Sequence, residues 1–275
     1  MLIKNSLLLF ILFVLIFLSC KKDTIQDEYL NQSYGSHERN KLDIRLPDGH
    51  NANTPMVILI HGGGWIGGDK NDMASFANLF TLNGIGTAAI NYRYANGADI
   101  TYEDLMVDIG YAIAYLNGKS GAYLFSMNRP CILGYSAGGH MAMLYAHAYD
   151  ANNKIGGITS MVGPADLTDS TQISLLVAFG ADSILWDLMG SSIPLQQASP
   201  IYRIGDVPTQ YIYGQLDNLV PYQPAKSMYD SLQLKNIDSE WILFNDADHN
   251  VYGTNFQHAD SINKATIRWV KTYGD

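Results

Sequence analysis

Gly134-Tyr135-Ser136-Ala137-Gly138 is the stretch that decides the fold of this chain. It stands between a short apolar run, 130–133, and a second apolar run, 139–146, that has the composition of a helix. Small residues on both sides of a serine let the backbone turn sharply from strand to helix and expose the serine Oγ. The pentapeptide alone is a weak signal, but in this setting it predicts a nucleophile elbow at Ser136.

A glycine-rich loop upstream supplies a second feature. Residues 56–60 form an unbroken apolar run that ends at His61-Gly62-Gly63-Gly64-Trp65, as expected of a buried parallel strand that enters a loop. Acyl transfer passes through a tetrahedral oxyanion, which preorganised N–H donors stabilise. The three glycines, together with the amide of Ala137, therefore predict an oxyanion hole. An ordinary glycine-rich turn is the alternative.

The N-terminus has the features of a secretory signal. Lys4 precedes twelve unbroken apolar residues, 7–18, which are followed by Ser19-Cys20. A membrane span takes about 20 residues, so the pattern predicts a signal peptide over residues 1–19. The end of this segment resembles a bacterial lipobox, in which Cys20 would be acylated and become the first residue of the mature protein. A plain signal peptide or an uncleaved anchor is the alternative.

The residues after Cys20 are polar and lack an apolar period up to Ser36. We therefore expect residues 20–37 to form an acylated tether. A lipid anchor at Cys20 would attach the protein to the membrane of a bacterial cell envelope, on the periplasmic or the cell-surface side.

Composition limits the remaining classes of function. The chain has 275 residues, 47% of them hydrophobic, which suits one catalytic domain over 38–275. The net charge of −9 becomes −10 when residues 1–19, with their one basic residue Lys4, are removed. An acidic surface argues against nucleic acid as a partner and against broad adhesion to anionic lipid. With Cys20 acylated, only Cys131 would remain, so we expect no intramolecular disulfide.

Strand and helix patterns alternate along the chain, which predicts an α/β fold with a mostly parallel sheet covered by helices on both faces. The predicted strands are 42–46, 56–60, 86–92, 130–133, 155–162, 209–213 and 240–244. The predicted helices are 71–83, 102–116 (ended by Asn117-Gly118), 139–146 and 263–273. The segment 163–200 is expected to be a helical insertion at the carboxyl ends of the strands, where open α/β sheets bind ligands. A packed scaffold segment is the alternative.

A nucleophilic serine needs a base, and the base needs an orienting carboxylate. In hydrolases with an elbow the chain order is serine, acid, histidine. His249 follows the last predicted strand in a polar loop, where a base can reach across the edge of the sheet. His140 and His147 lie on the helix that leaves the elbow and are expected to be packing residues, and His258 lies near the terminal helix without a strand before it. We therefore predict that His249 is the base.

The acid should follow the strand before that one. Asp217 stands just after the predicted strand 209–213, ahead of a Val-Pro pair that turns the chain into a helix. Asp246 and Asp248 are the rivals, but both are so close to His249 in sequence that they are expected to shape its loop. We therefore predict that Asp217 is the acid.

Taken together, the chain resembles an α/β-hydrolase of the hormone-sensitive-lipase-like and kynurenine-formamidase-like group over residues 38–272. H-G-G-G-W, G-x-S-A-G, a late G-x-x-D and a final Asp-x-His loop occur in that order in the group and here. The resemblance implies Ser136 as nucleophile, Asp217 as acid and His249 as base. It further implies Gly63, Gly64 and Ala137 as the oxyanion donors, and His61 as a residue that shapes the loop.

The chain also resembles lipid-anchored carbohydrate esterases of gut and soil bacteria. This resemblance implies a serine esterase that hydrolyses short acyl or aryl esters, such as acetyl or feruloyl groups on plant polysaccharide, through an acyl-enzyme. No long amphipathic cap precedes the first strand, which argues against long-chain lipid substrates. Trp65 and Tyr135 are the candidate substrate contacts.

No cofactor is expected, and no His/Asp/Glu cluster has the spacing of a metal site. A serine aminopeptidase-like activity or an aryl formamidase activity would use the same three side chains. A catalytically silent surface-binding lipoprotein is the alternative outside enzymes, although a binding module needs no serine, acid and base. The sequence leaves the oligomeric state open.

Overall fold

The structure is a computed structural model that describes residues 27–178, 180–181, 183–190, 194–253 and 255–275. Within these residues eight strands form one sheet in the order β1-β2-β4-β3-β5-β6-β7-β8. The strands are β1 Asp27–Ser33, β2 Lys41–Leu46, β3 Met56–Ile60, β4 Gly86–Ile90, β5 Cys131–Tyr135, β6 Gly157–Met161, β7 Thr209–Gly214 and β8 Ser239–Phe244. β3 to β8 pair in parallel, whereas β2 pairs antiparallel with both β1 and β4. The predicted mostly parallel α/β sheet is confirmed.

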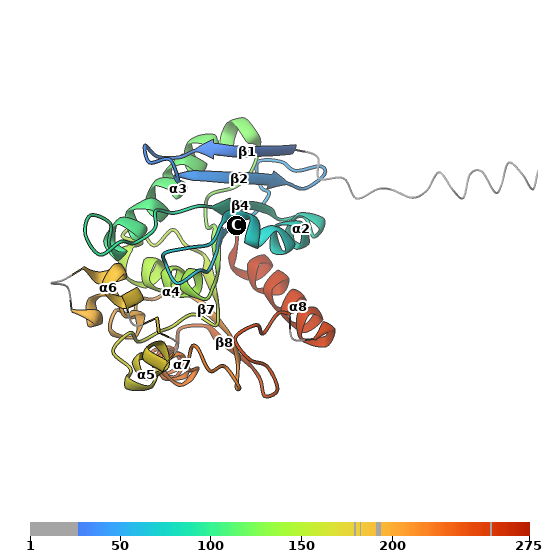
Figure 1. Cartoon of the computed structure of the whole chain (residues 1–275). Helices are drawn as coiled ribbons and strands as arrows, with labels where there is room; N and C mark the ends of the chain where they lie inside the picture. Colours follow the sequence, from blue (N-terminus) through green and yellow to red (C-terminus); the bar gives the residue numbers. More distant parts are fainter. Residues whose placement is uncertain (1–26, 179, 182, 191–193, 254) are drawn as a thin grey trace, which may run out of the picture.

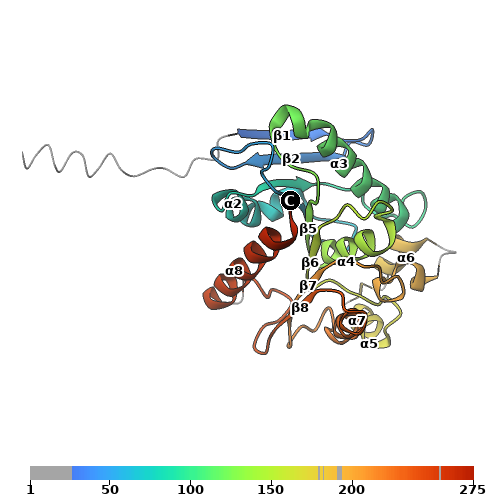
Figure 2. The same cartoon turned by 180° about the vertical axis from the view of Figure 1, so that it is seen from behind.

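Helices cover both faces of this sheet, as predicted. The α-helices are α2 Ala74–Leu82, α3 Tyr102–Tyr123, α4 Ala137–Leu144, α5 Ser170–Ala178, α6 Ser183–Met189, α7 Gln223–Leu234 and α8 Phe256–Tyr273. Shorter helical turns are η1 Lys70–Met73, η2 Tyr145–Tyr149 (a π-helical turn), η3 Leu195–Ala198 and η4 Pro200–Tyr202. Figures 1 and 2 show α2 and α8 on one face and α3, α4 and α7 on the other. Within the described chain no single helix combines the length and apolar composition of a membrane span; α5 and α6 reach those limits only as a pair bent by 119°.

The central strands are the most deeply buried part of the protein. Every residue of β3, β4 and β6 is buried, because helices lie over both of their faces. The carboxyl ends of parallel strands lie at a common edge of the sheet. The loops that follow β3, β5, β7 and β8 therefore meet at that edge, where open α/β sheets bind ligands.

The expectation of a tether over residues 20–37 is wrong for part of that segment. Residues 27–33 form β1, whose exposure alternates along the strand. Tyr29 stacks on Tyr123 of α3 with ring centroids 3.8 Å apart, and Glu28 pairs with Arg45 of β2 at 2.9 Å. An edge strand of this kind is held by backbone pairing and needs few apolar residues, so the polar sequence hid it. The signal peptide predicted for residues 1–19 and the acylated Cys20 lie outside the described residues.

Two helix boundaries also differ from the prediction. The Asn117-Gly118 pair lies inside α3, which continues to Tyr123. Gly118 is exposed with open space around it, so the helix tolerates it at a modest cost in propensity. The helix ends instead at Leu124, which adopts a left-handed conformation with φ 57°. α8 begins at Phe256 rather than residue 263, because the Asn255 side chain caps its first turn by accepting from the backbone N–H of His258.

Candidate active site

The turn between β5 and α4 holds Ser136 in an unusual backbone conformation, with φ 54° and ψ −121°. The turn is possible because its flanking glycines carry no side chains. A Cβ on Gly134 would lie 2.0 Å from the carbonyl oxygen of Gly138, and a Cβ on Gly138 would lie 2.1 Å from that of Ile60. The Ser136 amide donates to the carbonyl of Met161 at the end of β6 (2.8 Å). Close backbone packing therefore fixes the serine at the carboxyl edge of the sheet, in a strained conformation that is typical of functional sites.

A line of hydrogen bonds joins the three side chains that the sequence predicts as nucleophile, base and acid. Ser136 Oγ lies 3.0 Å from His249 Nε2, and His249 Nδ1 lies 2.8 Å from Asp217 Oδ2. The Asp217 side chain is fully buried, and that of His249 is 21% exposed. A carboxylate next to Nδ1 favours the tautomer with its proton there. The lone pair on Nε2 is then free to accept the proton of the serine hydroxyl.

The Asp217 carboxylate is held by its own loop. Oδ1 accepts the backbone N–H groups of Leu219 (2.9 Å) and Val220 (2.8 Å), which leaves Oδ2 for His249. The two rival carboxylates have other partners. Asp246 is 73% exposed and pairs with His258 at 3.0 Å, and Asp248 accepts the amide of Asn250 at 2.9 Å.

The loop that carries His249 is fastened to the strand that carries the serine. The Tyr135 hydroxyl donates to the His249 carbonyl oxygen at 2.7 Å. A Cβ on Gly214, at the end of β7, would lie 2.3 Å from the Ala247 carbonyl oxygen. These two contacts fix the distance between the elbow and the histidine loop.

The glycine loop after β3 presents free amides beside the serine. Gly63, Gly64 and Trp65 all have positive φ (107°, 57° and 64°). A Cβ on Gly62 would lie only 3.2 Å from the Ser136 Cβ, so the loop passes directly over Ser136. Within the described residues the amides of Gly63, Gly64 and Ala137 have no protein acceptor. Ala137 opens α4, where first-turn N–H groups are unpaired by geometry.

A layer of polar aromatic residues supports this loop from beneath. Tyr92 stacks on His61, with ring centroids 4.3 Å apart, and its hydroxyl donates to the Gly62 carbonyl at 3.1 Å. Burial lowers the pKa of His61 to about 4, so the ring is neutral, and its Nδ1 lies 2.6 Å from the same carbonyl. Arg39 donates to the Gly68 carbonyl at 3.2 Å and lies over the ring of Tyr94. His61 therefore supports the glycine loop, as the resemblance implied. The contact of Arg39 with this loop was not predicted from the sequence.

Trp65 is not placed as a substrate contact. Its side chain is buried, and its indole N–H donates to His140 Nδ1 at 3.1 Å. His140 in turn donates from Nε2 to the Ala198 carbonyl at 2.6 Å. Burial lowers the pKa of His140 to about 4, so the ring stays neutral. His140 is a buried packing residue, as expected. Its hydrogen bond to Trp65 of the glycine loop was not predicted, because no sequence pattern around His140 indicates that partner.

A cavity of about 360 Å³ opens between the glycine loop and the histidine loop, and Tyr135 and Asn250, the sequence neighbours of Ser136 and His249, are among its lining. Tyr135, the second predicted substrate contact, lines it. So do Phe76 and Tyr252, whose rings lie 4.7 Å apart. The remaining lining residues are Gly62, Gly63, Gly68, Asp72, Met73, Ser75 and Asn250. The walls are therefore part aromatic and part polar. Phe76 and Tyr252 are far apart in sequence, and no local pattern brings them together.

The segment 163–200 borders the site on another side. The Gln172 side chain, on α5, donates to the carbonyl of Leu219 at 2.7 Å, two residues after Asp217. The Ile184 side chain, on α6, lies 3.4 Å from where a Cβ on Gly64 would be. Both helices of the segment therefore lie against loops of the candidate site.

Metal ligands and cysteine thiols are two further kinds of reactive group. No group of three or more His, Cys, Asp or Glu side chains among the described residues could hold a metal ion. Cys131 is a free, buried thiol in β5. Burial raises its pKa to about 12, so it is not a reactive thiolate at neutral pH.

Comparison with known proteins identifies a family and several relatives that this chain resembles. The family model BD-FAE matches residues 42–232. The isoprenylcysteine alpha-carbonyl methylesterase ICME of Arabidopsis thaliana is 24% identical over 237 residues, which cover 78% of this chain and 55% of that protein. The Mycobacterium tuberculosis protein named Probable carboxylic ester hydrolase LipM is 28% identical over 232 residues, covering 77% of this chain and 53% of that protein. The chain thus spans about half the length of these curated relatives.

Among solved structures, a truncated form of a carbohydrate esterase from gut microbiota superposes with a TM-score of 0.73 at 18% identity. The superposition covers 90% of this chain and 97% of that one. At this identity the match establishes a shared fold.

Proposed function

The chain belongs to the BD-FAE family, and from that premise we propose that it is a serine esterase that hydrolyses carboxylic esters through an acyl-enzyme. The observation that carries the proposal is the hydrogen-bonded line from Ser136 Oγ through His249 to Asp217. This line ends beneath unpaired amides of the glycine loop. An esterase needs both parts at one point: an activated nucleophile, and donors for the charge that its attack creates.

In the acylation step, Ser136 Oγ attacks the ester carbonyl carbon while its proton passes to His249 Nε2. The carbonyl oxygen becomes an oxyanion and accepts N–H groups from Gly63, Gly64 and Ala137. Asp217 stays ionised and stabilises the imidazolium. The tetrahedral intermediate then collapses, and His249 gives its proton to the departing alcohol oxygen, which leaves an ester between Ser136 and the acyl group.

In the deacylation step, water replaces the alcohol. His249 accepts a proton from the water as its oxygen attacks the acyl carbon, and the same amides hold the second oxyanion. Collapse of this intermediate breaks the bond to Ser136 Oγ, and His249 returns the proton to that oxygen. The free acid leaves, and the enzyme is restored.

We assign the cavity between the glycine loop and the histidine loop to the alcohol part of the ester. The general acid must face the leaving oxygen, and the cavity lies between Gly62–Gly63 and the residues that follow His249. Its mixture of aromatic rings with Asp72, Ser75 and Asn250 fits a hydroxylated or aromatic alcohol better than a lipid tail. We therefore propose short acyl or aryl esters as substrates, with acetyl or feruloyl groups on plant polysaccharide as the leading class.

The decisive experiment combines labelling with a substrate panel. A fluorophosphonate probe should add to Ser136, as mapped by mass spectrometry, and Ser136→Ala should lose both the label and about 10⁴–10⁶-fold in turnover. The panel comprises p-nitrophenyl acetate, butyrate and octanoate, acetylated xylan, methyl ferulate, an aminoacyl anilide and an aryl formamide. Absence of hydrolysis of every ester would overturn the esterase proposal. Cleavage of the anilide alone would assign a peptidase, and cleavage of the formamide alone a formamidase. Binding of acylated xylan without any turnover would assign a silent surface-binding protein.

We further propose that the protein is anchored in a bacterial cell envelope through an acylated Cys20. Support comes from the basic Lys4, the apolar run 7–18 and the Leu18-Ser19-Cys20 sequence. Metabolic labelling with a palmitate analogue should mark the wild type and spare Cys20→Ala. Equal labelling of the two proteins would refute the anchor and leave the esterase proposal untouched.

A further inference from the structure

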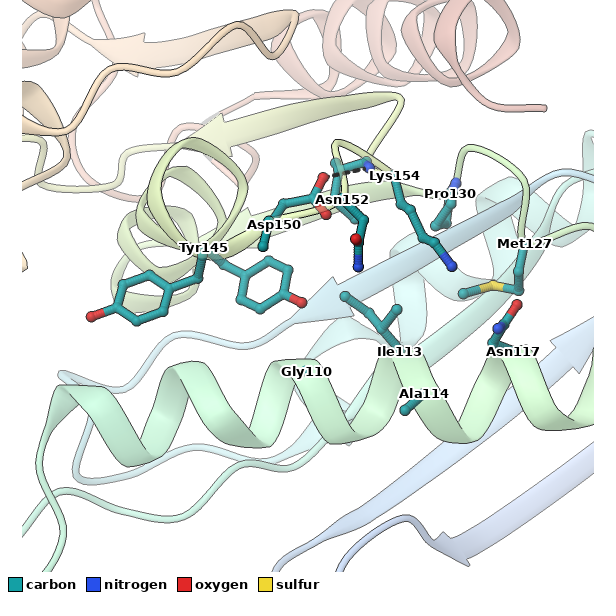
Figure 3. Close-up of a pocket in the computed structure, with 13 residues that line it drawn as sticks. Gly110, Ile113, Ala114, Asn117, Met127, Pro130, Tyr145, Asp150, Asn152 and Lys154 are labelled. Atoms are coloured by element: carbon teal, nitrogen blue, oxygen red, sulfur yellow. Dashed lines mark hydrogen bonds between the residues drawn. The ribbon is translucent and has the colours of Figure 1, made fainter.

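A second cavity, of about 260 Å³, lies away from Ser136. It is enclosed by α3, by the π-helical turn η2 at the end of α4, and by the loop that leads to β6. Figure 3 shows Tyr145 and Asp150 on one wall and Gly110, Ile113 and Ala114 of α3 on the other. Because its floor includes residues that precede β5 and β6, the cavity lies at the amino ends of the strands, the opposite end from the candidate active site.

The wall formed by η2 carries a hydroxyl without a partner. Tyr145 is 8% exposed, and within the described residues its hydroxyl makes no hydrogen bond. The hydroxyl faces α3 where that helix has no side chain, since a Cβ on Gly110 would lie 3.7 Å from the Tyr145 oxygen. Burial, with the nearby Asp150 carboxylate, raises the pKa of Tyr145 to about 12, so this hydroxyl keeps its proton. The hydroxyl opens onto the cavity, and a ligand with an acceptor oxygen would give it a hydrogen-bond partner.

The backbone around Tyr145 is equally specific. The amide of Asp150 donates to the carbonyl of Tyr145 at 3.0 Å, which closes the wide π-helical turn. Turns of this kind inside helices occur often at functional sites. One Asp150 oxygen accepts the Ile155 amide at 2.8 Å, and the other has no partner in the described chain. The turn therefore presents a donor and an acceptor to the same cavity.

The charges around the cavity favour a neutral ligand. Asp150 contributes one negative charge, and the exposed Lys154 contributes one positive charge without an ion pair among the described residues. An anion would meet the Asp150 carboxylate, and a cation would meet the Lys154 ammonium. The amides of Asn117 and Asn152 add groups that both donate and accept.

Apart from Tyr149, the rest of the lining is apolar, with Ile113, Met127 and Ile155 among it. The ligand should therefore combine hydroxyl groups with an apolar C–H face, which is the chemistry of a sugar ring. The volume is below the ~300–1,000 Å³ of pockets that hold drug-sized ligands, so it suits a single ring. We infer that the cavity between α3 and η2 is a second binding site, for one neutral sugar unit, with Tyr145 and Asp150 as its polar contacts.

This inference does not rest on the esterase proposal, because the cavity is distant from Ser136 and its ligand need not be an ester. Methyl β-xyloside and methyl β-glucoside serve as probes, added to the full chain with ¹³C-methyl methionine and followed by NMR. The Met127 methyl signal, assigned with Met127→Leu, should shift in a saturable manner. Tyr145→Phe, which removes only the hydroxyl, should weaken the fitted affinity about fivefold or more. Hydrolysis of p-nitrophenyl acetate, if present in the wild type, should stay within about twofold.

Two further variants keep the test sharp if Tyr145→Phe perturbs the turn. Ala114→Leu places a larger side chain in the cavity from an exposed position of α3, and should abolish the Met127 shift. Ala122→Leu makes the same change farther along α3, outside the cavity, and should leave the shift unchanged. Failure of both glycosides to move the Met127 signal would overturn the inference. So would wild-type affinity in both Tyr145→Phe and Ala114→Leu, or a response to acetate or methylammonium in place of the glycosides.

Discussion

The indole N–H of Trp65 donates to Nδ1 of His140, and this bond ties the glycine loop to the helix that leaves the serine elbow. His140 Nε2 in turn donates to the carbonyl of Ala198, near the end of the segment 163–200 that borders the site. The two residues are 75 positions apart and both buried. The loop that carries the proposed oxyanion donors is therefore positioned by a hydrogen bond to the same helix whose first residue, Ala137, supplies the remaining donor.

Loss of that bond should slow the chemical step more than substrate binding. Trp65→Phe keeps a ring and removes the N–H, so we expect kcat for p-nitrophenyl acetate to fall about tenfold while KM stays within about twofold, since small displacements of catalytic groups are costly. Inhibition by a trifluoromethyl ketone, which forms a tetrahedral adduct, should weaken in parallel. Trp269→Phe is the matched control, because Trp269 is also buried and its indole N–H has no partner in the described chain. Equal loss of kcat in the two variants would remove the positioning role.

Asp217→Asn should lower kcat by about 10⁴-fold, as the equivalent change does in chymotrypsin-type triads. The amide cannot stabilise the imidazolium, and it favours the wrong tautomer of His249. Steady-state kinetics at pH 7.5 would measure the loss. Asp246→Asn and Asp248→Asn serve as controls, since these carboxylates contact His258 and the Asn250 amide instead. A large loss in either control, with Asp217→Asn near wild type, would reassign the acid.

Two glycine substitutions should change stability in opposite directions. Gly134→Ala would force a Cβ to within 2.0 Å of a backbone carbonyl, so we expect a loss of more than about 3 kcal/mol or failure to fold. Gly118→Ala adds a methyl group in open space within α3 and should stabilise by up to about 1 kcal/mol. Urea denaturation of both variants beside the wild type is the measurement. A stable Gly134→Ala protein would contradict the close packing at the elbow.

Stability should decline in mild acid because three histidines are buried as neutral rings. Burial lowers the pKa of His61, His140 and His147 to about 4, whereas an unfolded histidine has a pKa of about 6.5. As the pH falls from about 6.5 to about 4, the unfolded chain takes up protons that the folded chain refuses, so the free energy of unfolding decreases. Above about pH 6.5 this contribution is fully retained.

Urea midpoints between pH 7.5 and 4.5 would measure this decline. His147 lies far from the active site, between the Gly205 carbonyl and Thr209, so His147→Gln should flatten the curve without altering the reaction. A pH-independent midpoint in the wild type would contradict the neutral buried state of the three rings.

The features that the sequence predicted well are those with strong local patterns. The apolar run 56–60 coincides with β3, because a strand buried on both faces is apolar throughout. Ser136, Asp217 and His249 each follow a strand of the parallel part of the sheet, β5, β7 and β8, and parallel strands bring their carboxyl ends together. The sequence order alone therefore sufficed to propose which side chains meet.

The features that the sequence missed depend on contacts between distant segments. Trp65 could be interpreted as a substrate contact because nothing near it indicates that His140 would accept its N–H. The edge strand β1 was hidden because backbone pairing with β2, rather than apolar side chains, holds it. The cavity rings of Phe76 and Tyr252 belong to segments far apart in the sequence, so no local pattern indicates their contact.

The edge strand β1 also limits how far an anchored enzyme could reach. Because β1 begins at Asp27, only residues 21–26 would separate an acylated Cys20 from the folded domain. Even fully extended, that distance is at most about 25 Å, less than the thickness of a membrane with its headgroups. The anchored domain would stay close to the membrane surface, and only substrates that reach this surface could be hydrolysed.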